Sequence, residues 1–285
     1  MPSIVDRDAV ETARYEDRGR FGMGACADVR RVYDRRMKRE VALKIVRSDR
    51  REDTRAIRRV RFESLLAGNL FHSGIPPVFD RDVLPDGRPF FTMRAIQGTS
   101  LMDETIRFHR RLGPGGPGGM DTLLKLVRRM VEVAAAVDAA HATGIIHRDL
   151  KLANIMLPFA GPAQVVDWGL AVDLANPPTR LGRTGTRGYM PPEQERGHHS
   201  ALAPTADVFA MGEMLARILF GAGHETGRVH HPRHRPPPEL AEVCAIARSM
   251  NPADRYPDAK SMGIALEQAL DQVHRAVPLR PRLAS

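Results

Sequence analysis

The segment His147–Asn154 places an acid, an amine and an amide close together in the chain. Asp149 can orient an alcohol and accept its proton, and Lys151 can neutralise negative charge on a group in transfer. Asn154, together with Asp167 further along, can hold Mg²⁺ through oxygen atoms. An ordinary loop after a helix is the alternative, but four chemical roles in this order favour a reaction centre.

A glycine-rich segment lies near the start of the chain. Gly22–Val29 matches the pattern G-x-G-x-x-G-x-V, except that Ala27 stands at the third glycine. Glycines allow backbone N–H groups to approach a phosphate that a Cβ would obstruct. A plain β-hairpin turn explains the segment equally well, so it indicates a phosphate site only together with other residues.

A strand that ends in lysine, Val41–Lys44, follows the glycine-rich segment. In an alternating strand, Ala42 and Lys44 share one face, so a small residue can lie under a base while the ammonium reaches phosphate oxygens. Glu63, in the next expected helix, is the candidate carboxylate to pair with this lysine. The alternatives are a solvated lysine at a strand end and an exposed glutamate on an arginine-rich helix.

These segments, in this order, resemble the eukaryotic-type (Hanks-type) Ser/Thr protein kinases, in the form often found in bacteria, over about residues 14–272. The resemblance implies an α+β, bilobal protein-kinase-like fold with ATP in the cleft. The smaller lobe, an antiparallel sheet with one helix, would span residues 12–96. The larger, mainly helical lobe would span residues 97–275, followed by a tail at 276–285.

The resemblance also implies roles for single residues. Asp149 would be the catalytic base, Lys151 would contact the γ-phosphate, and Asn154 and Asp167 would be the Mg²⁺ ligands. Lys44 would hold the α- and β-phosphates and pair with Glu63. The residues expected around the nucleotide are Gly22, Gly24, Val29, Ala42, Lys44, Glu63, the gatekeeper Met93, and Ile96 in the hinge that begins at Arg94.

The segment Gly185–Glu193 is similar to the end of a kinase activation segment. By that likeness, Thr186 lies beside Asp149 and Lys151. Asp207 is expected to anchor the backbone of the catalytic loop from a buried helix, and Arg255 to pair with Glu193.

Arg148 precedes the expected base, and kinases with this arginine are often switched by phosphorylation of the activation segment. A phosphate brings about two negative charges to pair with it. The candidate acceptors are Thr179 and Thr184.

The elements that must position these residues follow from the apolar pattern. Val29–Tyr33 and Glu40–Val46 are predicted strands, and Leu84–Gly87 predicts a hairpin turn before a further strand at 90–93. Glu52–Phe71 is a predicted helix whose apolar residues are Ile57, Val60, Leu65, Leu66 and Leu70.

From about residue 100 the pattern is helical, and the composition break near residue 97 predicts the boundary between the lobes. A long core helix runs from Leu123 to His141 and ends before Gly144. Further helices are indicated by apolar stripes at 208–219, 240–250 and 262–273. The stripe at 240–250 includes Met250, and Gly113–Gly119 is a predicted flexible loop.

Composition indicates a globular protein. The 285 residues are 42% hydrophobic and 27% charged, which is enough apolar material for a full core. The two cysteines suit a reducing compartment. The first residues lack a basic and an apolar region, and the longest uncharged run, 152–166, is broken by prolines. We therefore expect a soluble, cytoplasmic protein with no membrane partner.

A net charge of +9 favours an acidic or phosphorylated partner. The basic cluster comprises Arg47, Arg50, Arg51, Arg55, Arg58, Arg59 and Arg61, and suits an acidic regulator or an activation-segment phosphate. Nucleic acid is not favoured, since that interpretation rests on net charge alone. A loop with His224, His230, His231 and His234 lacks nearby cysteine and is expected to be solvated rather than metal-binding.

The function expected from these residues is ATP- and Mg²⁺-dependent transfer of the γ-phosphoryl group to Ser or Thr hydroxyls of proteins, with autophosphorylation. The competing hypothesis is an ATP-binding pseudokinase or scaffold, suggested by Ala27 and by only 17 residues between Gly221 and Glu239, where the family usually has a docking helix. A small-molecule phosphotransferase would not need the 185–193 segment.

Overall fold

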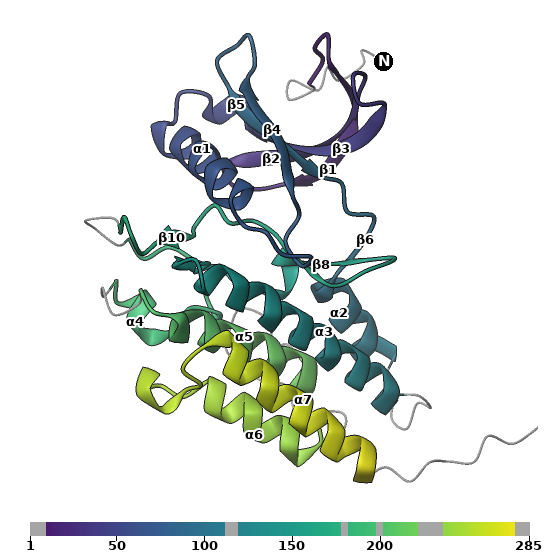
Figure 1. Ribbon diagram of the computed structural model, residues 1–285, viewed down its shortest axis with the longest axis vertical. Coiled ribbons are helices and arrows are strands. Elements are labelled where there is room, and N and C mark those ends of the chain that lie inside the picture. Colours follow the sequence, from purple (N-terminus) through teal and green to yellow (C-terminus); the bar gives the residue numbers. More distant parts are fainter. Residues whose placement is uncertain (1–9, 112–118, 178–181, 198–201, 222–235, 277–285) are drawn as a thin grey trace, which may run out of the picture. The chain divides into compact units, whose positions relative to one another are not determined.

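The computed structural model describes residues 10–111, 119–177, 182–197, 202–221 and 236–276. The chain divides into two compact units (Figure 1). The first unit contains residues 1–97 together with Asp167–Leu170. The second contains Gly98–Val166 and Ala171–Ser285.

The first unit contains a five-stranded sheet in the order β1-β2-β3-β5-β4, in which every neighbouring pair is antiparallel. Its strands are β1 (Tyr15–Met23), β2 (Ala27–Asp34), β3 (Arg39–Val46), β4 (Val78–Val83) and β5 (Pro89–Arg94). Both predicted hairpins, β2–β3 and β4–β5, are confirmed.

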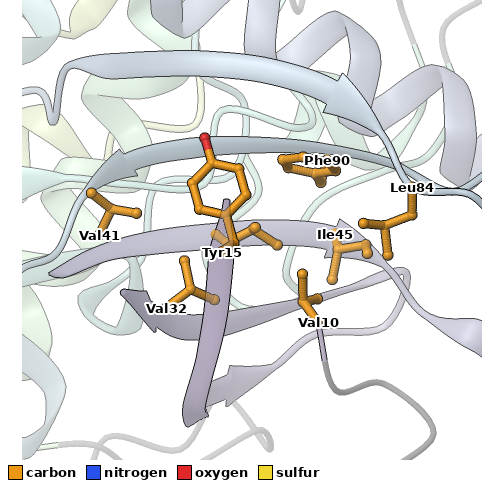
Figure 2. Close-up of a cluster of buried hydrophobic side chains, with 8 residues drawn as sticks. Val10, Tyr15, Val32, Val41, Ile45, Leu84 and Phe90 are labelled. Atoms are coloured by element: carbon orange, nitrogen blue, oxygen red, sulfur yellow. The ribbon is translucent and has the colours of Figure 1, made fainter. Parts of the chain in front are cut away.

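Alternation along β3 gives the sheet two different faces. Val41, Leu43 and Ile45 point to one face, where they pack in a cluster with Val10, Tyr15, Val32, Leu84 and Phe90 (Figure 2). The rings of Tyr15 and Phe90 meet edge to face with centroids 5.7 Å apart. Since strand side chains alternate, Ala42 and Lys44 lie on the other face, which is the one that α1 covers.

Helix α1 (Thr54–Gly68) begins at Asp53, whose side chain accepts hydrogen bonds from the first turn. Its buried face includes Ala56, Val60 and Glu63. The prediction that Leu65 belongs to this face is wrong, because that side chain is 48% exposed. At 3.6 residues per turn, Leu65 lies on the side of the helix opposite the 56–60–63–67 stripe that faces the sheet.

The second unit is mainly helical. Its helices are α2 (Leu101–Arg111), α3 (Gly119–His141), α4 (Pro192–Glu195), α5 (Pro204–Phe220), α6 (Pro238–Ala247) and α7 (Ala259–Ala276). The long helix α3 packs against α5 and α7, and α6 packs against both α5 and α7 (Figure 1). This arrangement confirms the predicted core helix. Met250 is not in the core as predicted: α6 ends before it, and its side chain is 68% exposed.

Short strands position the loops between α3 and α5. β7 (Ile145–Ile146) pairs with β10 (Val172–Asp173), and β8 (Ile155–Pro158) lies between β6 (Gly98–Ser100) and β9 (Gln164–Val165). The segment 147–154 therefore runs between two anchored strands. Short 3₁₀ turns, η1 (Ser48–Arg50), η2 (Leu152–Asn154) and η4 (Pro252–Asp254), complete the elements.

Some predictions fall outside the described residues. These are residues 113–118 of the loop predicted at Gly113–Gly119, the acceptor Thr179, the four histidines of the 222–235 segment, and the length of any docking helix there. Gly119, the last residue of that predicted loop, is instead the first residue of α3. Within the described part of the chain, no helix is both long and apolar enough to cross a membrane.

Candidate active site

In the first unit, Lys44 lies between two carboxylates. Its Nζ is 2.6 Å from Glu63 Oε1 and 2.8 Å from Asp167 Oδ1. The lysine and glutamate side chains are 10% and 4% exposed. The predicted Lys44–Glu63 pair is confirmed, and the alternatives of a solvated lysine and an exposed glutamate are wrong.

Burial and charge act in opposite directions on this pair. Burial lowers the pKa of Lys44, but attraction to Glu63 and Asp167 outweighs it, and the pKa of the lysine is raised. The pKa of Glu63 is also raised: burial is the largest cause and repulsion from Asp167 adds to it, while the charge of Lys44 and its hydrogen bond act in the opposite direction. The positive charge of Lys44 is therefore what allows two carboxylates to lie so close together.

Gly169 allows α1 to approach the segment 167–170 closely. A Cβ on Gly169 would lie 2.5 Å from Arg59 Nε and 2.9 Å from Glu63 Oε2, where it has no room. Arg59 also places Nη2 3.9 Å from Asp167 Oδ1. Asp167 has φ +64°, a left-handed conformation that costs a non-glycine residue about 1–2 kcal/mol. The cations at 44 and 59 stabilise the carboxylate in this position.

Ala27, which departs from the glycine-rich pattern, is a core residue. Gly24 N donates to Ala27 O at 2.9 Å, and a Cβ on Gly24 would lie only 2.9 Å from the same oxygen. Glycine is thus required at position 24. Ala27 is 7% exposed and belongs to a hydrophobic cluster with Val46, Ala56, Val60 and Phe91. Its methyl group packs in the core of the first unit.

We predict that Ala27→Gly lowers the free energy of unfolding by about 1 kcal/mol, because it removes a buried methyl group and makes the unfolded chain more flexible. The urea midpoint measures this loss. Ala25→Gly, an exposed change in the same turn, is the control and should cost less. An Ala27→Gly variant as stable as wild type would contradict the packing of this methyl group.

In the second unit, three side chains meet around one hydroxyl group. Thr186 Oγ1 donates to Asp149 Oδ1 at 2.7 Å and accepts from Lys151 Nζ at 2.8 Å. Lys151 Nζ is also 2.9 Å from Asp149 Oδ2. The predicted placement of Thr186 beside these two residues is confirmed. An alcohol therefore lies hydrogen-bonded to a carboxylate, with an ammonium group next to it.

Asn154 is joined to the same loop. Its Nδ2 donates to the backbone oxygen of Asp149 at 2.9 Å, and the residue is 6% exposed. His147 supports the loop from inside, since its Nδ1 accepts from Asp149 N at 3.2 Å and its Nε2 lies 3.3 Å from Val166 O. The side chains of positions 149 and 154 are thus fixed relative to one another.

Asp207, on α5, holds the backbone of the catalytic loop. Its two oxygens accept from His147 N and Arg148 N, both at 2.8 Å, and Oδ2 is 2.9 Å from His141 Nε2. Burial raises the pKa of Asp207, but these hydrogen bonds and the two nearby histidines outweigh it, so the pKa is lowered. The predicted anchor is confirmed. Arg148, with φ +64°, is stabilised in a left-handed conformation by this carboxylate.

The activation segment is fixed at its end by a buried ion pair. Arg255 Nη1 and Nη2 lie 2.7 and 3.0 Å from the two oxygens of Glu193, as predicted. The arginine also donates to the backbone oxygens of Thr205 and Ser249. Such a two-pronged pair positions a backbone more rigidly than a single hydrogen bond.

Other predicted site residues lie where the sheet places them. Ala42 is opposite Met93 on neighbouring strands, and Val29 is opposite Lys44. Met93 and Ile96 are half-buried, and Gly22 is exposed. These five residues belong to the first unit, as Lys44 does, whereas Asp149, Lys151 and Asn154 belong to the second.

Two residues that position the loop were missed at the sequence level. Gln194 is 1% exposed, and its Nε2 donates at 2.7 Å to both Arg148 O and Thr184 O. His141 matched an apolar stripe and was counted as a core position, although its ring binds Asp207. No spacing rule links Gln194 to Arg148, which lies 46 positions away, or His141 to Asp207, which lies 66 positions away.

Comparisons with known proteins agree with this geometry. The family model described as protein kinase domain matches residues 15–248. The chain is 31% identical to serine/threonine-protein kinase PknL of Mycobacterium tuberculosis over 96% of this chain and 71% of the relative. It is 32% identical to PknD of the same species, over 93% of this chain and 40% of PknD. It is 30% identical to a probable PknB of Corynebacterium glutamicum, over 89% and 42%.

The fold and the two clusters of site residues define a protein kinase. The chain belongs to the protein kinase family, and the relatives named above are bacterial serine/threonine kinases. It spans about two fifths of PknD and PknB.

Proposed function

We propose that this protein transfers the γ-phosphoryl group of ATP to Ser and Thr hydroxyls of proteins. The observation that carries the proposal is the hydroxyl of Thr186, which is bound to Asp149 and Lys151 as a substrate alcohol would be. The names of the relatives and the family support the same reaction.

In the proposed reaction, the substrate oxygen forms a bond to the γ-phosphorus while the bond from that phosphorus to the bridging oxygen breaks, and ADP leaves. Asp149 orients the hydroxyl and takes its proton. Lys151 neutralises charge on the transferred group, and Lys44, positioned by Glu63, binds the α- and β-phosphates. Positioning and charge neutralisation supply most of the catalysis, since no covalent intermediate is needed.

The residues proposed to hold Mg²⁺ fit a hard cation that prefers oxygen ligands. The side chain of Asp167 is 32% exposed, so its carboxylate is accessible. Asn154 uses its amide nitrogen within the loop, and its amide oxygen makes no hydrogen bond to the described residues. When bound, Mg²⁺ would neutralise charge on the phosphate oxygens.

An assay with two labels tests the proposal. Protein incubated with Mg²⁺ and ATP labelled in the γ-phosphate should pass the label to itself and to a generic basic protein. The same incubation with ATP labelled in the α-phosphate should leave protein unlabelled. Equal labelling from both positions, or none from either, would contradict γ-phosphoryl transfer.

We propose also that phosphorylation of the activation segment increases activity. The Arg148 side chain is buried, and its Nε has no hydrogen-bond partner among the described residues. Burial lowers the pKa of this guanidinium, and Asp207 offsets only part of that effect. Gln194 links the backbones of Arg148 and Thr184, so a phosphate near position 184 could supply the missing negative charge.

We predict that autophosphorylated protein turns over faster than phosphatase-treated protein, and that Thr179→Ala with Thr184→Ala keeps the lower rate under both treatments. Steady-state rates on one protein substrate check this. Thr54→Ala, exposed on α1, is the control and should respond like wild type. Equal turnover of the double variant and autophosphorylated wild type would contradict regulation through these threonines.

Residues 12–96 are proposed as the nucleotide-binding lobe and 97–275 as the lobe that carries the catalytic loop. The division of the chain at residue 97 supports this assignment. The pseudokinase hypothesis loses one of its two motivations, because the Ala27 methyl group packs in the core.

A further inference from the structure

Arg217, on α5, contacts the segment that carries Thr186. Its Nη2 donates to Gly188 O at 2.7 Å, and its guanidinium lies over the ring of Tyr189, with Cζ 3.9 Å from the ring centroid. The arginine side chain is 17% exposed. Arg217 lies 29 positions beyond Gly188 in the chain, so these contacts join a core helix to the activation segment.

The contacted segment is a tight turn. Tyr189 N donates to Thr186 O at 3.1 Å, and Gly188 has φ +82°, as the third residue of a type II β-turn requires. A Cβ on Gly188 would lie 3.1 Å from Arg217 Nη2, so glycine also leaves room for the guanidinium. The first residue of the turn is Thr186, whose hydroxyl is bound by the proposed base. The conformation of the turn therefore decides where that hydroxyl lies.

Tyr189 also joins the turn to the catalytic loop. The pKa of this tyrosine is raised: burial is the largest cause, while the charge of Arg217 and a hydrogen bond with the backbone of Leu152 act in the opposite direction. Leu152 directly follows Lys151 in the loop. Tyr189 therefore touches both Arg217 and the loop that carries the proposed base.

A second arginine shares the carboxylate that Arg217 uses. Arg217 Nη1 is 2.8 Å from Glu213 Oε2, one turn earlier on α5, and Arg248 Nε is 2.7 Å from Glu213 Oε1. An i,i+4 ion pair by itself stabilises a helix only slightly. The contacts with Gly188 and Tyr189 are therefore what distinguish Arg217 from Arg248, which has no hydrogen bond to the turn among the described residues.

We propose that Arg217 is a positioning residue for phosphoryl transfer: it fixes the turn beside Asp149, against which the substrate hydroxyl must be placed. Arg217 touches neither ATP nor the substrate and acts through Gly188 and Tyr189. The kinetic consequences rest on the proposed kinase activity, but the order of the turn can be measured without any transfer.

Hydrogen exchange followed by mass spectrometry tests the order of the turn, with the full chain and no ATP. In Arg217→Gln, the peptide that carries the Tyr189 amide should exchange about tenfold faster than in wild type, because the bond to Thr186 O opens more often. Arg248→Gln removes the other arginine at Glu213 and should stay within about twofold of wild type. Unchanged exchange in Arg217→Gln, or equal acceleration in both variants, would overturn the proposal.

Steady-state kinetics test the consequence for the reaction. Arg217→Gln should lower kcat/KM for a peptide with one Thr about tenfold, the equivalent of about 1.4 kcal/mol. The KM for ATP should not change, because Arg217 is not among the residues proposed to bind the nucleotide. Arg248→Gln should keep about half or more of the wild-type kcat/KM.

Two versions of the peptide, with Glu or with Lys next to the Thr, separate positioning from direct contact. Arg217→Gln should lower kcat/KM by the same factor for both peptides. A loss that depends on the charge of the peptide would assign Arg217 to substrate binding and overturn the positioning role. Wild type that transfers no phosphate would contradict the proposed function instead, and hydrogen exchange would still decide whether Arg217 holds the turn.

Discussion

Lys44→Met should abolish detectable phosphoryl transfer and lower the free energy of unfolding by about 3–5 kcal/mol, as expected when one partner of a buried ion pair is removed. The variant leaves Glu63 buried, with Asp167 nearby and no ammonium between them. It also removes the group that we propose binds the α- and β-phosphates. Transfer rates and urea unfolding measure the two effects.

The loss of stability should depend on pH in a defined direction. Burial already raises the pKa of Glu63, and Lys44 partly offsets that rise, so removing Lys44 raises the pKa further. A carboxyl group whose pKa is raised by folding contributes stability that is present below its unfolded pKa and lost as pH rises through its folded pKa. The free energy of unfolding that Lys44→Met loses relative to wild type should therefore be larger at about pH 8 than at about pH 5.

A double variant separates the structural effect from the chemical one. Adding Glu63→Gln to Lys44→Met removes the buried charge, so most of the stability and of the pH dependence should return. Phosphoryl transfer should not return, because the phosphate contact is still missing. A Lys44→Met protein as stable as wild type at about pH 8 would contradict the buried pair.

Asp149→Asn should lower the rate of transfer by about 10²–10⁴-fold while the protein stays folded. The change removes the proton acceptor but keeps an oxygen that can accept from Thr186, and the bond from Asn154 to the backbone at position 149 is unchanged. ATP with Mg²⁺ should still raise the melting temperature of the variant. Because the shape is kept, the loss can be assigned to chemistry.

Asp271→Asn is the matched control, since it makes the same substitution at an exposed position on α7. It should transfer phosphate at the wild-type rate. A wild-type rate from Asp149→Asn would mean that another group takes the proton from the alcohol. A variant that neither transfers phosphate nor binds ATP would show that the substitution disturbs more than the base.

The partners that the sequence predicted correctly came from ordered motifs. Lys44 with Glu63, Asp207 with the catalytic loop, and Arg255 with Glu193 lie at recognisable positions in a kinase-like order. The two partners of each pair are at least 19 positions apart in the sequence, so hydrophobic periodicity alone does not predict that they meet.

Other features depend on packing that no motif records. The Ala27 methyl group looked like an intrusion into a phosphate turn, but β2 directs it into the cluster beneath α1. Gln194 was not singled out because a buried amide that bridges two backbone oxygens has no sequence pattern. Hydrophobicity alone predicted Leu65 and Met250 in the core, but both are exposed. Leu65 points away from the sheet on α1, and Met250 lies beyond the last residue of α6.

Helices and strands are hardest to predict from the sequence where they are short or where few of their apolar side chains are buried. Helix α2 buries only Leu101, Thr105 and Phe108, one of which is polar, so its apolar periodicity is faint. Strands β7 and β10 have two residues each, too few for alternation to be seen. These strands nevertheless anchor the loop that carries Asp149.

Intact-protein mass spectrometry after incubation with ATP and Mg²⁺ tests the central claim, that Asp149 directs transfer of a phosphoryl group to a protein hydroxyl. Wild type should gain the mass of one or more phosphoryl groups, and Asp149→Asn, incubated alone for the same time, should gain at most about a hundredth of that amount. Fragmentation would then show which Ser or Thr residues carry them. The contrary result would be wild-type protein that binds ATP, as shown by a higher melting temperature, but transfers no phosphate. In that case neither its own mass nor the mass of an added protein substrate would increase.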